Sequence, residues 1–316
     1  MGKTSNIVAY RYCRGLSLVE LMIASAIGLL MLGAVVSLFL STKVSYTDSE
    51  RMSAMYSNGR YGLSMLAEEL RLVDFWGPTR ASNITNHAAL DAIASDCSGS
   101  AAGYDLANAL WATTASAATV ATCITDAAIN SDVLFVKHAA PTETAVADID
   151  SDLTYVMSND TVGVLFDGAD TAPSTTTGGV VPGGTAWELQ VTAYYVSNEE
   201  PPVLYRKQLQ GNTWAASEEV ASGIERLRVL FGQDTNNDGI ADTYSNAADA
   251  TWGNVVSVRV YLLVRSEQSD GKYTDEKTYQ LGDVTVDPAA NDHFHRIVFD
   301  TSVSVRNRRL LITGGF

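Results

Sequence analysis

Oxygen-bearing side chains recur at every second position of one short segment of the 316-residue sequence. The spacing follows the first nine positions of an EF-hand-type loop, with Gly239 at the sixth, so it predicts a Ca²⁺ site. Ser245 stands at the twelfth position, where an EF-hand has its bidentate Glu. The alternative is a hydrophilic hairpin turn, because Asn-Asp-Gly is a turn signal by itself. The candidate ligands are Asp234, Asn236, Asp238, Ile240 through its carbonyl, and Asp242.

A single carboxylate interrupts the most apolar part of the sequence. Glu20 follows Val19 and directly precedes a run without charged residues that extends from Leu21 to Thr42. A carboxylate within a lipid bilayer costs about 2.5 to 3.5 kcal/mol on the insertion scale. Glu20 therefore needs either a cationic partner or a position at the headgroup boundary, and its place in the sequence leaves both open.

The uncharged run after Glu20 is long enough to cross a hydrocarbon core of roughly 30 Å as one helix. Lys3, Arg11 and Arg14 precede it without any acidic residue. The positive-inside rule then predicts a cytoplasmic N-terminus, with everything after the span outside. The sequence predicts a protein anchored by one membrane span.

Composition and motifs argue against two classes of function. The chain has 36 acidic and 21 basic residues, a net charge of −15, whereas nucleic-acid binders present a basic surface to the phosphates. No HExxH, GxSxG or P-loop motif occurs in the sequence. We therefore expect neither a nucleic-acid partner nor an enzyme.

The element that carries Glu20 is predicted to be a long helix over residues 16–76. Apolar or small residues recur at spacings of three and four as far as Val73, and Gly77-Pro78 ends the pattern. Residues 77–131 are predicted to be an irregular connecting region, and alternation of period two predicts an antiparallel β domain over 132–316. The predicted fold class is α+β, with a long N-terminal transmembrane and amphipathic helix packed on an antiparallel sheet.

The string around Glu20 identifies a family. The residues RGLSLVELMIASAIGLLMLGAVVSLFL resemble the class III signal of type IV prepilins. This resemblance implies a pilin-like fold and a leader, 1–15, that a prepilin peptidase removes by cutting after Gly15. It also implies N-methylation of Leu16, where most members have Phe, and pairing of Glu20 with the α-amino group of a neighbouring subunit. Two opposite charges in a layer of low dielectric constant are tolerated when they are paired.

Loss of the leader would remove one of the three cysteines, Cys13, and leave Cys97 and Cys123. An even pair in an oxidising compartment predicts a disulfide, with two free thiols as the alternative. A bridge across this segment would contribute roughly 3 kcal/mol to stability.

Three further segments, 60–77, 219–244 and 295–309, resemble the PilW group of minor pilins. The resemblance implies a role in type IV pilus assembly, in the initiating or tip complex with other minor pilins and the major pilin, and with a tip adhesin as a further partner. The protein would lie in the bacterial inner membrane, surrounded by its lipid, with a periplasmic C-terminal domain, and then in the pilus or pseudopilus. The alternatives are a J-type pseudopilin of type II secretion and a membrane-tethered, calcium-dependent adhesion module.

Overall fold

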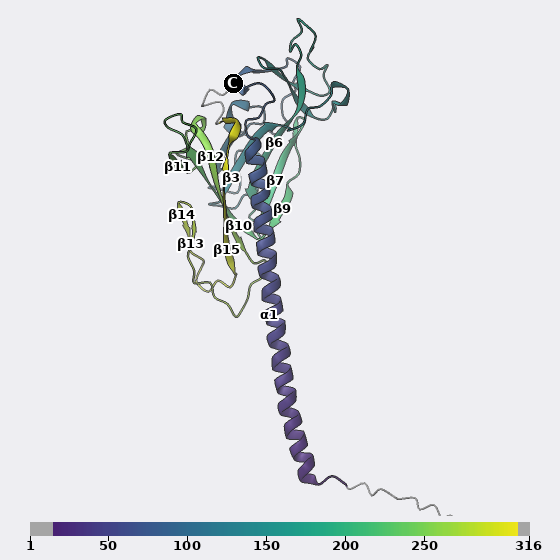
Figure 1. Ribbon diagram of the computed structural model, residues 1–316, viewed down its shortest axis with the longest axis vertical. Coiled ribbons are helices and arrows are strands. Elements are labelled where there is room, and N and C mark those ends of the chain that lie inside the picture. Colours follow the sequence, from purple (N-terminus) through teal and green to yellow (C-terminus); the bar gives the residue numbers. More distant parts are fainter. Residues whose placement is uncertain (1–14, 309–316) are drawn as a thin grey trace, which may run out of the picture. The chain divides into compact units, whose positions relative to one another are not determined.

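The computed structural model describes residues 15–308 and confirms the predicted α+β class (Figure 1). The chain divides into two compact units, one running to Arg51 and the other beginning at Met52. Of the predicted leader, residues 1–14 lie outside the described residues, and so do residues 309–316 of the predicted β domain. All named strands belong to the second unit.

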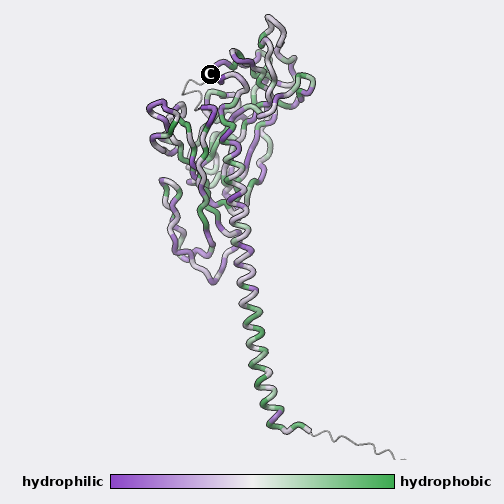
Figure 2. The backbone as a smooth tube through the Cα atoms, in the orientation of Figure 1, coloured by the Kyte–Doolittle hydropathy of each residue, from purple (hydrophilic) through white to green (hydrophobic). Residues whose placement is uncertain are grey.

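The helix α1 runs from Leu18 to Leu72 and comprises 55 residues. Apolar residues dominate its N-terminal part (Figure 2). The helix ends because Asp74 adopts a φ of 64°, a left-handed conformation that a right-handed helix cannot contain. The amide of Phe75 donates to the carbonyl of Leu72 at 3.0 Å, and the side chain of Asn307 donates to the same carbonyl at 3.4 Å. These bonds satisfy a carbonyl that the helix end would otherwise leave without a donor.

The larger sheet has nine strands arranged around β6. The first residues of β6 pair with β4, its middle with β3 and its last residues with β7. All these pairings are antiparallel, whereas β1 and β5 pair in parallel. The strands are β1 (Ile84–Asn86), β2 (Leu110–Thr114), β3 (Asp132–Ala139), β4 (Thr154–Ser158), β5 (Gly163–Asp167), β6 (Thr185–Val196), β7 (Val203–Gln210), β8 (Thr213–Trp214) and β9 (Glu218–Ser222).

A four-stranded antiparallel sheet has the order β11-β10-β12-β15. The two-stranded hairpin β13-β14 forms a separate sheet that packs against it, with Tyr279 and Leu281 next to Leu263. These strands are β10 (Ile224–Gln233), β11 (Thr243–Ser245), β12 (Val255–Arg265), β13 (Tyr279–Leu281), β14 (Val284–Val286) and β15 (Arg296–Ser304). Short 3-10 turns occur at Ala81–Asn83, Gly99–Ala101, Leu106–Asn108, Val146–Asp148 and Trp252–Asn254.

The C-terminal part of α1, from Met52, packs across both larger sheets. A Cβ atom at Gly62 would meet Leu204 of β7 at 3.3 Å and Leu262 of β12 at 3.2 Å. A Cβ atom at Gly59 would come within 2.6 Å of the ring of Phe299 on β15. The two glycines therefore allow the helix to approach the sheets closely. The buried residues of the helix are Met55, Gly59, Gly62, Leu66, Ala67 and Leu70.

The close contact at Gly59 gives a test of this packing. We expect Gly59→Val to reduce the free energy of unfolding by about 1 to 3 kcal/mol, because the added methyl groups overlap the Phe299 ring. The same substitution should cost less in a Phe299→Ala background, since residues in contact are not energetically independent. Urea unfolding of the full chain in detergent measures both costs, and equal costs in the two backgrounds would contradict the proposed contact.

Candidate functional site

The N-terminal end of α1 is closed by a reciprocal pair of hydrogen bonds. The amide of Ser17 donates to Oε2 of Glu20 at 2.9 Å, and the amide of Glu20 donates to Oγ of Ser17 at 3.1 Å. This is a capping box, and it places a negative charge at the positive end of the helix dipole. The predicted cleavage point between Gly15 and Leu16 lies just before this cap and outside the helix.

The helical stretch that follows Glu20 exposes its apolar side chains. It is long and apolar enough to cross a membrane, and none of its most apolar window is buried within the protein. The exposed fractions reach 76% at Leu30 and 68% at Phe39. An exposed apolar surface of this length requires lipid or other apolar helices around it.

Two hydroxyl groups in or next to the apolar part of α1 donate to carbonyl oxygens of their own helix. Ser25 donates to the carbonyl of Leu21 at 2.7 Å, and Thr42 donates to that of Leu38 at 2.9 Å. Such bonds to the preceding turn are the usual way to satisfy hydroxyl groups within a helix. These two hydroxyls therefore enter an apolar environment with their hydrogen bonds already made.

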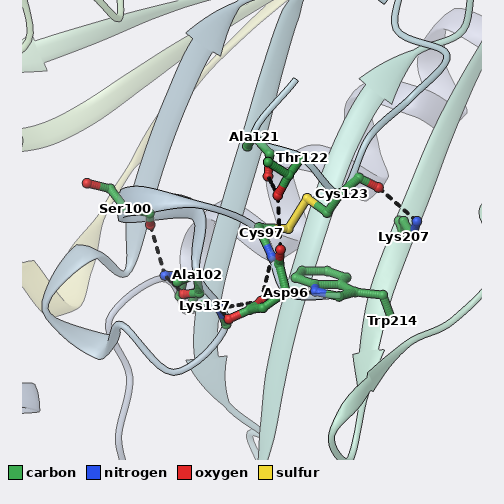
Figure 3. The surroundings of a disulfide bond; sticks show 11 residues. Asp96, Cys97, Ser100, Ala102, Ala121, Thr122, Cys123, Lys137, Lys207 and Trp214 are labelled. Carbon is green, nitrogen blue, oxygen red and sulfur yellow. Dashed lines mark hydrogen bonds between the residues drawn. A yellow bond between two sulfur atoms is a disulfide. The ribbon is translucent and has the colours of Figure 1, made fainter. Parts of the chain in front are cut away.

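The disulfide between Cys97 and Cys123 joins two segments of the region between α1 and β3 (Figure 3). The Cα atoms of the two cysteines are 4.8 Å apart. Beside them, Oδ1 of Asp96 accepts hydrogen bonds from the amide of Cys97 at 2.7 Å and the indole of Trp214 at 3.1 Å. The bridge and the carboxylate together fix this segment against β8.

A buried lysine holds the loop that follows Cys97. Nζ of Lys137 on β3 donates to the carbonyls of Ser100, Ala102 and Asp105 at 3.0, 2.6 and 2.8 Å (Figure 3 labels Lys137, Ser100 and Ala102). Burial lowers the pKa of Lys137 to about 8, although the acidic groups of Asp105 and Asp96 favour its charged form. In the sequence, Lys137 is only part of a Lys-His pair within an apolar run. Nothing in that pattern predicts that it binds the loop after Cys97.

A buried ion pair, also missed from the sequence, connects the two larger sheets. Arg228 of β10 lies 3.1 Å from Oδ1 of Asp132 on β3, and its other nitrogen lies 2.7 Å from Asp283. Asp132 also accepts a hydrogen bond from the amide of Val229 at 2.8 Å. Burial raises the pKa of Asp132, and the charge of Arg228 opposes that shift. A buried pair of this kind restricts the relative position of the strands that carry it.

The five predicted Ca²⁺ ligands form one loop between β10 and β11. Asp234 is buried and accepts from the amides of Asn237 at 2.7 Å and Gly239 at 2.6 Å. Hydrogen bonds from Thr235 lower the pKa of Asp242. Over residues 15–308, no three His, Cys, Asp or Glu side chains converge as metal ligands would.

The remaining loop residues also make local bonds. Oδ1 of Asp238 accepts from the amide of Ile240 at 2.7 Å, and Oδ1 of Asn236 accepts from the amide of Asp238 at 2.9 Å. Ser245, at the twelfth position, lies on β11 and accepts from Gln233 at 2.6 Å. The binding of Ca²⁺ by this loop stays a prediction.

Comparison with known proteins gives two family matches. The prokaryotic N-terminal methylation motif matches residues 10–36, and type IV pilus-assembly protein W matches residues 193–307. Among solved structures, a type IV-like pilin from Thermus thermophilus is similar, with 13% identity and a TM-score of 0.37. The similarity covers 82% of this chain and 96% of that one. No curated protein sequence matches the chain.

The two family matches define the class of protein. The chain carries the methylation motif of pilins at the start of its apolar helix and the sequence pattern of pilus-assembly protein W over β7, β10, β12 and β15. The two matches support a type IV pilus minor pilin of the PilW group, as the sequence predicted. The matched families are structural, and they imply association with pilus components and a processing peptidase. The apolar helix and the motif fit a membrane-anchored pilin.

The buried lysine predicts a pH dependence of stability. The folded chain releases the Lys137 proton near pH 8, whereas the unfolded chain keeps it to about pH 10.5. Stability rises with pH wherever the unfolded state binds more protons, so the cost of burying the charge is present below pH 8 and disappears toward pH 10.5. We expect wild type to gain about 3 kcal/mol relative to Lys137→Met over this interval. Chemical unfolding of both proteins from pH 7 to 10.5 measures the difference, and a constant difference would contradict it.

Calcium binding by the loop is tested by thermal unfolding. Excess CaCl₂ should raise the Tm of wild type by a few degrees, because an ion that binds only the folded state stabilises it. Asp238→Ala should abolish the rise, and the control Asp300→Ala, which removes an exposed carboxylate on β15, should retain it. The prediction is wrong if calcium leaves the Tm of wild type unchanged.

Proposed function

We propose that this minor pilin acts in the initiating or tip complex of the type IV pilus, together with other minor pilins and next to the major pilin. The observation that carries the proposal is the exposed apolar part of α1, with the single carboxylate of Glu20 at its start. Such a helix is stable in lipid or among similar helices, and these are the two environments that pilus assembly offers. The globular domain, with its two larger sheets, then presents the surface for partner pilins or a tip adhesin.

Processing would complete the charge pair. Cleavage by the prepilin peptidase after Gly15 creates an α-amino group at Leu16, which the same enzyme would methylate. The capping bond of Glu20 uses Oε2, so Oε1 can accept from the ammonium group of a neighbouring processed chain. Opposite charges attract more strongly in a low-dielectric layer than in water. Glu20 would therefore guide each chain to the correct axial position beside its neighbour.

The location follows from the same features. The basic residues before the span favour a cytoplasmic N-terminus in the inner membrane, which places the globular domain in the periplasm. The disulfide supports this orientation, because such bonds persist in oxidising compartments. We propose an assembly role without catalysis, since the matched families are structural.

The role of Glu20 is tested by substitution. We expect Glu20→Ala to insert into the membrane at the wild-type level, because the change removes a charge from an apolar segment. The variant should be lost from sheared filaments, since the α-amino group of its neighbour would have no counter-ion. Glu50→Ala is the matched control, because Glu50 is an exposed carboxylate on the same helix. Immunoblots of membrane and filament fractions give the result, and wild-type recovery of Glu20→Ala in filaments would refute the role.

The assembly role itself is tested by deletion. Filaments counted by electron microscopy should disappear in the deletion strain, return with the wild-type gene and stay absent with a Gly15→Val variant that resists processing. Intact filaments combined with a loss of protein secretion would instead favour the J-type pseudopilin.

A further inference from the structure

A groove of about 360 Å³ lies on the globular domain beside the disulfide. Three segments line it: β2, the residues that follow Cys97 and the residues that precede Cys123. Its size is at the lower end of the range for small-molecule sites. The groove belongs to the second unit, and neither Glu20 nor the apolar part of α1 lines it.

One aromatic ring and a set of hydroxyl groups form the lining. Trp111 is half-buried, and its ring packs against Phe135 at 5.5 Å between centroids while it also lines the groove. No Asp, Glu, Lys, Arg or His side chain lines the groove. The groove is lined by six hydroxyl side chains. That of Thr114 donates to Asp132 at 2.6 Å. Within residues 15–308, no hydrogen bond to another protein group engages the other five, which belong to Ser98, Ser100, Thr113, Ser116 and Thr119.

This lining selects the chemistry of a ligand. A charged ligand would find no counter-ion, and a lipid chain would meet polar groups that it cannot satisfy. Hydroxyl groups both donate and accept, so they match a ligand that itself carries many hydroxyls. The apolar face of an indole suits the C–H face of a sugar ring, while the indole N–H can donate at its edge. We propose that this groove binds a neutral saccharide, with one ring packed on Trp111.

The surrounding structure holds the groove in place. Its two loop segments are joined directly by the Cys97–Cys123 bridge. The loop after Cys97 is further fixed by the three hydrogen bonds of Lys137, and β2 is fixed by its ladder to β3. A site that is already ordered loses little conformational entropy when a ligand binds. The disulfide therefore serves ligand binding as well as stability.

Saturation-transfer NMR on the purified full chain tests the proposal. The chain is kept in lauryldimethylamine oxide, because maltoside and glucoside detergents would compete as sugars. The probes are maltotriose, cellotriose and chitotriose, with sialyllactose and an unstructured Gly-Ser peptide as comparison ligands. We expect saturation transfer to at least one neutral trisaccharide, with no comparable signal from the two comparison ligands.

Variants locate the binding. Trp111→Ala should weaken the affinity by about tenfold, the effect of losing one aromatic contact. Thr113→Val, which keeps the shape of the side chain, should weaken it by a smaller factor. Thr125→Val, an exposed threonine outside the groove, is the matched control and should bind as wild type does. Melting curves and the mass of the oxidised protein confirm that each variant is folded.

Three results would overturn the proposal: no transfer to any neutral trisaccharide, transfer that survives both Trp111→Ala and Thr113→Val in folded protein, or a stronger response to the peptide. The measurement uses the isolated chain, so it succeeds or fails independently of filament assembly.

Discussion

The structure depends on one helix whose two parts must be stable in different surroundings. The N-terminal part of α1 exposes apolar side chains, whereas its C-terminal part, from Met52, packs with both larger sheets of the globular domain. The first part gains its stability from lipid or from other helices, and the second from buried contacts within the chain. The carboxylate of Glu20 adds an electrostatic condition to the apolar part, since it is best tolerated when it is paired.

The globular domain maintains its structure by interactions that do not involve the apolar helix. Arg228 and Asp132 join the two larger sheets, while Lys137 and the disulfide order the segment between α1 and β3. Because these contacts lie within the second unit, changes in what surrounds the first unit leave them intact. The folded domain is therefore stabilised independently of whether lipid or other helices surround the apolar part of α1.

Features that depend on local pattern could be predicted from the sequence. The long apolar helix follows from an uncharged run, the disulfide from the count of cysteines, and β12 from the alternation of its valines and leucines. Features that depend on distant contacts could not. Two neighbouring residues of β6 are buried on opposite faces of the strand: Tyr194 in the core that includes α1, and Tyr195 in the core that includes the disulfide. Both faces of the last part of β6 are therefore buried, and its residues do not alternate between buried and exposed. The roles of Lys137 and Asp132 arise only when loops and strands far apart in sequence meet. The groove beside β2 is likewise assembled from three separate segments.

Two hydroxyl groups of α1 keep their hydrogen-bond partners when the surroundings of the helix change. Ser25 and Thr42 bond to carbonyls of their own helix, and these partners travel with it. Moving the helix from bilayer to a bundle of similar helices exchanges one apolar surrounding for another and breaks neither bond. The two hydroxyl groups therefore contribute little to the free-energy difference between the helix in the bilayer and the helix in a bundle. These two hydrogen bonds are therefore independent of which apolar surrounding the helix has.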